Sequence, residues 1–156
     1  MKEMLLKTAG QLIPPERQFA EEFSLKKEKL AEMCSLSLAG RKDIDHLIGT
    51  GNQSMARDND RNFARFMDAL FTDYSPAVFV ETVLWVFRAY RSHGFQTTYW
   101  ACNLNIWADK LKEELSPGAY AQIYPFYNWL IINIPQFSGL TDEIPMDPSI
   151  DTVHGT

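Results

Sequence analysis

SPAVFVETVLWVFRAYRSHGF, residues 75–95, is the stretch of this chain that decides its fold. Ser75 stands directly before Pro76, and a capping hydroxyl followed by a residue without a backbone N–H is a strong helix-start signal. The rest of the segment is apolar on nearly every side and is interrupted by three charged residues, Glu81, Arg88 and Arg91. Because such a helix must bury most of its circumference, we expect residues 76–94 to form a helix at the centre of an α-helical domain.

A second Ser-Pro pair, Ser116-Pro117, predicts another helix start, and apolar residues spaced three and four apart predict helices on both sides of it. The expected helices cover residues 2–12, 15–38, 41–49, 52–74, 76–94, 96–115 and 117–137. Pro125 should kink the last of these helices, because its ring clashes with the preceding turn. We expect the helix over 15–38 to be peripheral, since Lys26 falls in its apolar stripe.

Strand signals are nearly absent, so we expect an all-α domain of about six to seven helices over residues 1–137. Residues 138–156 contain prolines and acidic side chains without helical periodicity, and we expect them to form a tail or linker. Asn52 is expected to cap the helix that it precedes, and Gly94 to interrupt the chain after the apolar helix.

The composition fits one folded domain, because 46% of the 156 residues are hydrophobic and 13% are aromatic. The net charge of −5 disfavours nucleic acid as a partner. No apolar run is long enough to cross a membrane, and the N-terminal residues do not resemble a signal peptide, so we expect a cytoplasmic protein without a membrane partner. Cys34 and Cys102 show no metal-binding spacing and are expected to be reduced thiols.

Sequence motifs typical of enzymes, such as HExxH, GxSxG and Gly-rich phosphate loops, do not occur, so we expect no catalysis and no metal site. Asp58-Asn59-Asp60 does not match a calcium loop and is interpreted as a solvated helix face. Glu81 should pair with a cation from another helix or another subunit, because an unpaired carboxylate in an apolar helix is costly.

Bulky aromatic residues cluster on the two helices that flank Gly94. They either fill the core or line a small-molecule cavity, because several large rings are hard to pack without leaving space. His93 either caps the end of its helix or lies beside that cavity. The candidate ligand-binding residues are Trp85, Arg88, His93, Tyr99, Trp100 and Trp107.

FRAYRSHGF at residues 87–95, followed by WADKL at residues 107–111, resembles the corresponding part of the N-terminal sensor domain of RsbR-type stressosome proteins. The order of the helices likewise resembles a globin-like bundle. The resemblance implies a non-haem globin-like fold, a homodimer formed through helices, and transfer of a stress signal to a regulatory output. Such sensors usually precede an output domain, so the tail is either a truncated linker or the chain signals to a separate protein.

Together these observations predict a regulatory or sensory domain that binds a small apolar ligand or a protein partner and passes on a signal without catalysis or a cofactor. The alternative is a tetrapyrrole-binding globin-like protein that holds haem through His93.

Overall fold

The computed structural model describes residues 1–143, which form eight α-helices and no β-strand. The expected all-α class is therefore confirmed, with one helix more than the upper expectation. Residues 144–156 of the expected tail, which include His154, lie outside the described part of the chain. The helices are α1 (Lys2–Ala9), α2 (Arg17–Ala39), α3 (Ile44–Ile48), α4 (Gln53–Thr72), α5 (Pro76–Ser92), α6 (Thr97–Glu114), α7 (Pro117–Ile132) and α8 (Ile134–Glu143).

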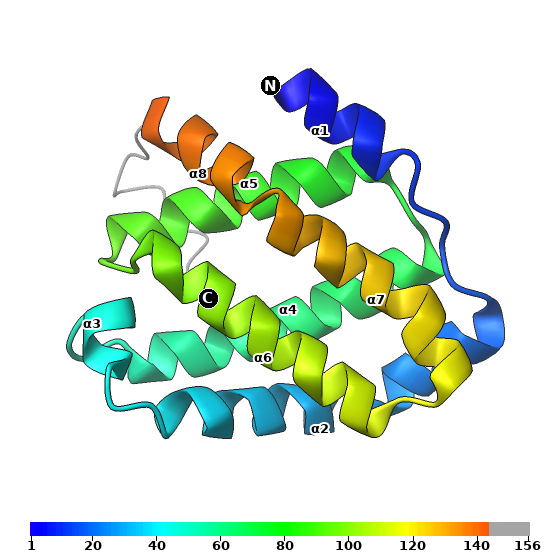
Figure 1. The fold of residues 1–156 in the computed structure, drawn as a ribbon, viewed down its shortest axis with the longest axis horizontal. Coiled ribbons are helices and arrows are strands. Elements are labelled where there is room, and N and C mark those ends of the chain that lie inside the picture. The colour runs from blue at the N-terminus through cyan, green and yellow to red at the C-terminus, as the bar shows by residue number, and fades with distance from the viewer. Residues whose placement is uncertain (144–156) are drawn as a thin grey trace.

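α6 and α7 pack against each other and run diagonally across the front of the view in Figure 1. α2 and α4 pack together along one edge of the molecule, whereas α1, α5 and α8 lie along the opposite edge. Within residues 1–143, no helix is both long and apolar enough to cross a bilayer.

Both Ser-Pro pairs begin a helix, as predicted. Ser75 Oγ accepts a hydrogen bond from Val78 N at 3.2 Å, and Ser116 Oγ accepts one from Ala119 N at 3.3 Å. Each proline occupies the first turn, where its missing N–H leaves no hydrogen bond unmade. These two starts are local signals, which explains why sequence alone located them.

The single helix expected over residues 117–137 is wrong, because the chain breaks at Asn133 and continues as α8 to Glu143. Pro135 accounts for the break, because it has no N–H to bond the carbonyl four residues earlier and its ring clashes with that carbonyl. Asn133 Nδ2 instead donates to Trp129 O at 2.8 Å. α7 runs through Pro125, and residues 138–143, expected in the tail, belong to α8.

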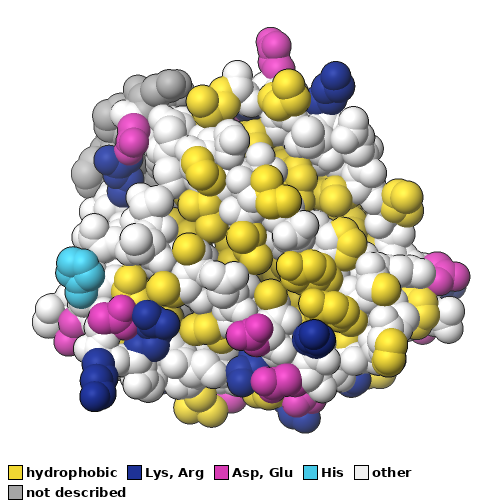
Figure 2. Space-filling model, viewed as in Figure 1, with side chains coloured by type: hydrophobic (Ala, Val, Ile, Leu, Met, Phe, Trp, Pro, Cys, Tyr) yellow, Lys and Arg dark blue, Asp and Glu magenta, His cyan; other side chains and the backbone are white. Residues whose placement is uncertain are grey.

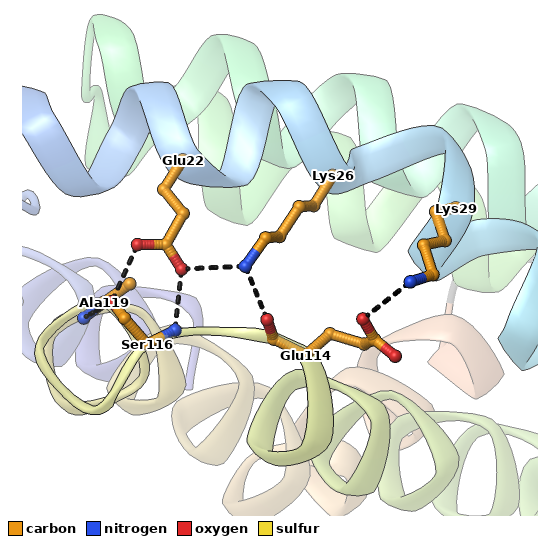
Figure 3. A network of polar contacts seen from close by, with 6 residues as sticks. All are labelled: Glu22, Lys26, Lys29, Glu114, Ser116 and Ala119. Carbon is orange, nitrogen blue, oxygen red and sulfur yellow. Dashed lines mark hydrogen bonds and ion pairs between the residues drawn. The ribbon is translucent and has the colours of Figure 1, made fainter.

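α2 lies along one edge of the molecule, and it packs against α4, α6 and α7 and buries Phe23, Leu30 and Cys34. The lysine in its apolar stripe has a structural role. Lys26 Nζ donates to Glu114 O, the last carbonyl of α6, at 2.6 Å, and it pairs with Glu22 at 3.3 Å (Figure 3). A cation at a helix C-terminus is stabilised by the unpaired carbonyls there. Lys26 therefore joins α2 to the end of α6.

α5 does not lie at the centre of the domain, contrary to our expectation. It packs against α1 and α8, and Val78 on its outer face is 51% exposed. Glu81 is also exposed and pairs with Lys2 of α1, which confirms that its cation comes from another helix. The apolar residues of α5 thus face two neighbouring helices and, as described below, a cavity.

The loops at the ends of α3 and α5 are fastened to each other. Asn52 makes no capping hydrogen bond, contrary to prediction; its Nδ2 donates to Ile48 O and to His93 O, each at 2.8 Å. Gln96 N donates to Leu47 O at 2.8 Å. Gly94 has a φ of +100°, a conformation that favours glycine. It follows His93, which occupies the C-cap position of α5 with its backbone N–H.

Candidate ligand cavity

A cavity of about 260 Å³ lies between α4 and α5 and is closed by residues of α6 and by Leu130 of α7. Its wall is mainly apolar, and the larger apolar residues are Phe63, Phe66, Val83, Phe87, Leu104 and Leu130. Polar side chains also reach it, namely Asn59, Asn62, Thr82, His93 and Asn103. The site therefore combines an apolar volume with a few hydrogen-bonding groups, as small-molecule sites generally do.

The space remains open because α4 and α5 take different neighbours: α4 packs against α2, whereas α5 packs against α1 and α8. Aromatic rings form the wall between them. Phe87 stacks on Trp100 with ring centroids 4.4 Å apart, and Tyr90 meets Trp100 edge-on at 5.8 Å. Large rigid rings held against one another cannot collapse into the remaining volume.

The six candidate residues divide into two groups. Trp85, His93 and Trp100 line the cavity, whereas the expected Tyr99, Trp107 and Arg88 do not. Tyr99 and Trp107 are instead fully buried and belong to a polar cluster described next. Arg88 Nε is buried and has no hydrogen-bond partner among residues 1–143.

The polar cluster centres on Asp60, which has no exposed surface. Trp107 Nε1 donates to Asp60 Oδ1 at 3.0 Å, and Ser35 Oγ donates to Oδ2 at 2.9 Å. Burial raises the pKa of Asp60 to about 6, although hydrogen bonds from Trp107, Ser35 and Asn103 oppose the rise. In the same region Asn59 Nδ2 donates to Tyr99 Oη at 2.8 Å, and burial raises the pKa of Tyr99 well above its ordinary value. The cluster connects α2, α4 and α6.

Reading residues 58–60 as a solvated helix face was wrong for Asn59 and Asp60, which are 5% and 0% exposed. The sequence does contain a signal for this. Asp60 lies four residues from both Ala56 and Ala64, and these two small buried residues form the face of α4 on which Asp60 lies. We predicted the buried face of α4 from its large apolar residues and did not consider the alanines. Asn103 was missed in the same way, since it lies four residues from both Tyr99 and Trp107 on the buried face of α6 but is itself polar.

Among residues 1–143, no group of three or more His, Cys, Asp or Glu side chains is placed to hold a metal ion. Comparisons of the chain with models of protein families, with curated protein sequences and with solved structures found no match.

Proposed function

We propose that this chain is a regulatory or sensory helical domain that binds a small, largely apolar molecule in the cavity between α4 and α5. The observation that carries the proposal is the cavity itself, about 260 Å³ in volume and walled by side chains from four helices. Ligand pockets typically measure about 300–1,000 Å³, so a ligand of one or two fused rings suits this volume best. Ligand occupancy is passed to a protein partner, and no catalytic step is part of the proposal.

The ends of the cavity helices offer a route for the signal. His93 lines the cavity, and its carbonyl accepts a hydrogen bond from Asn52 in the loop between α3 and α4. Gln96, just beyond α5, is bonded to Leu47 of α3. A ligand that prefers one spacing of α4 and α5 therefore also shifts this loop region, because a ligand favours the conformation that it binds more tightly.

Calorimetric titration with indole tests ligand binding directly. Ala89 lines the cavity and is buried, so Ala89→Leu fills part of the space and is expected to abolish indole binding. Ala69→Leu makes the same change at an exposed site on the outer side of α4 and should leave binding unchanged. Failure of the native protein to bind indole or similar one- and two-ring compounds would remove the support for this function.

The resemblance to stressosome sensor domains adds two finer proposals, a globin-like arrangement and a homodimer. A cavity between consecutive helices with two long helices packed behind it supports the first. Figure 2 shows hydrophobic side chains gathered across the face formed by α6 and α7, and such patches are typical of protein interfaces. Light scattering should then give twice the chain mass of 17.9 kDa, whereas a monomer at all concentrations contradicts the dimer.

Haem binding through His93 is the second candidate, favoured by the position of His93 on the cavity wall. The volume does not fit a tetrapyrrole, because about 260 Å³ is already below the range for drug-sized ligands. An absorption spectrum after incubation with haemin decides between the two candidates. A Soret band that is lost in His93→Ala would support haem, and its absence leaves the small apolar ligand.

A further inference from the structure

The cavity contains two buried carboxamides, one from each of two helices. Asn59 of α4 is 5% exposed and Asn103 of α6 is 1% exposed, and both line the cavity. Asn62, the third carboxamide on the wall, is exposed to solvent. A buried amide must find hydrogen-bond partners within the protein or in what occupies the space beside it.

For each buried carboxamide, the described part of the protein supplies a hydrogen-bond partner to only one of its two polar atoms. Asn59 uses Nδ2 to donate to Tyr99. The Asn103 side chain lies close enough to Asp60 to lower its pKa, and because an ionised carboxylate only accepts, the Asn103 atom that serves Asp60 is Nδ2. Asn103 Oδ1 has no partner among residues 1–143. The nitrogen of the Asn103 amide thus serves Asp60, and its oxygen is left without a partner in a side chain that lines the cavity.

We propose that the ligand is a neutral ring compound with a single hydroxyl or amide-type group, and that this group hydrogen-bonds to the Asn103 carboxamide at the inner wall, next to Asn59. The inference rests on the proposed function and specifies its ligand class. Asn103 is the residue that determines specificity, since it lines the cavity, is 1% exposed and carries a buried oxygen atom without a partner among residues 1–143.

Charge on the wall argues that the ligand is neutral. Of the described residues that line the cavity, none is an Asp, Glu, Lys or Arg. An ionised ligand would lose its hydration there without gaining a counter-charge. A ligand without any polar group would leave Asn103 Oδ1 unsatisfied, as it is without a ligand.

Phenol and toluene form a matched pair of probes, because they have the same ring and differ by a hydroxyl in place of a methyl group. In a purely apolar cavity toluene binds more tightly, since the hydroxyl loses its hydration. Calorimetric titration of the native protein should instead show phenol binding at least as tightly as toluene. Both probes should shift the NMR signals of the Asn103 side-chain amide through their ring currents, and phenol should add a larger shift because it also forms a hydrogen bond.

Two variants assign the effect to one residue. Asn103→Leu keeps the side-chain size and is expected to change the phenol-to-toluene affinity ratio about tenfold in favour of toluene, the amount that one net hydrogen bond contributes. Asn105→Leu makes the same change at an exposed residue of α6 that does not line the cavity, and it should leave the ratio unaltered. The NMR comparison uses the native protein, so it remains decisive if Asn103→Leu does not fold.

The outcomes separate this inference from the function on which it rests. Binding of both probes with toluene preferred tenfold, or a ratio that Asn103→Leu leaves unchanged, overturns the inference and leaves the apolar ligand site in place. Binding of neither probe to the native protein overturns both.

Discussion

Two carboxylates of this protein, Glu22 and Asp60, make comparable sets of hydrogen bonds and yet have pKa values shifted in opposite directions. Glu22 accepts from Ser116 N and from Ser116 Oγ, each at 2.7 Å (Figure 3). Asp60 accepts from Trp107 and Ser35 at 3.0 and 2.9 Å. The pKa of Glu22 is lowered, whereas that of Asp60 is raised to about 6.

The difference lies in burial and in the charge of the donors. Burial alone would raise the pKa of Glu22, but hydrogen bonds from Ser116 and the positive charge of Lys26 outweigh it. Glu22 belongs to α2, but its carboxylate lies beside the N-terminus of α7, where unpaired N–H groups favour an anion. Asp60 is fully buried, and all the side chains that donate to it are neutral. Neutral donors satisfy its oxygen atoms without offsetting the loss of hydration.

The largest effect is expected for Asp60→Ala, which leaves Trp107 Nε1 and Ser35 Oγ without their acceptor. Each buried donor left unpaired costs about 1–3 kcal/mol, so the free energy of unfolding should fall by about 4 kcal/mol. Asp58→Ala is the matched control on the same helix, since Asp58 is exposed and its pair with Arg61 spans 3.7 Å. Urea denaturation measures both variants; equal losses would contradict the central role of Asp60.

Acid should strengthen the Asp60 cluster. Its pKa in the folded protein, about 6, exceeds the ordinary value of 3.8, so the folded state binds the proton more tightly than the unfolded state. The contribution of Asp60 to stability is therefore greatest below about pH 4 and falls as the pH rises to about 6, by about 3 kcal/mol in total.

Asp60→Asn cannot titrate, so it isolates this contribution. The free energy of unfolding of the native protein minus that of Asp60→Asn, measured from pH 4 to pH 7 by urea denaturation, should decrease by about 2 kcal/mol, the part of the total that falls in this range. Glu22 behaves in the opposite sense, losing its contribution as the pH falls below its ordinary pKa, but it is present in both proteins and cancels in the difference. A flat difference would show that Asp60 is ionised without cost.

Glu22→Ala should have a smaller effect, because the carboxylate is 21% exposed and water can replace it in part. Loss of a group that bonds the start of a helix costs about 1–2 kcal/mol. Glu21→Ala, at the neighbouring residue of α2, removes only an exposed pair with Arg17 and should cost less than about 0.5 kcal/mol. Similar losses for the two variants in urea denaturation would mean that Glu22 does not support α7.

What could be predicted from the sequence depends on how far apart the interacting residues lie along the chain. The starts of α5 and α7 depend on adjacent Ser and Pro residues, so reading the chain locally located them. The break before α8 was also readable, since Pro135 marks it, but the apolar spacing continued across it and masked the signal. The role of Lys26 could not be read, because its acceptor, Glu114 O, is 88 residues away.

The candidate site divides in the same way. Aromatic clustering around Gly94 predicted Trp85, His93 and Trp100 on the cavity wall. Aromatic character could not separate these rings from Tyr99 and Trp107, because a ring that lines a cavity and a ring that fills a core look alike in sequence. The burial of Asp60 was overlooked although Ala56 and Ala64 mark its face of α4, and its hydrogen-bond partners could not be predicted because they come from other helices.

The smallest effect is expected for Lys2→Ala, which removes the ion pair between α1 and Glu81. The two side chains are 48% and 55% exposed, and pairs in water typically contribute about 0–1 kcal/mol. α1 has stronger attachments: Leu5 is fully buried, Tyr74 Oη donates to Ala9 O at 2.5 Å, and Trp129 Nε1 donates to Thr8 Oγ1 at 2.9 Å. Urea denaturation at low and high salt should show a loss below about 0.5 kcal/mol that disappears with salt, because screening already weakens the pair. A larger, salt-independent loss would mean that an exposed charge on this protein can contribute as much stability as Glu22. The contrast between Glu22 and Asp60 could then not be explained by burial.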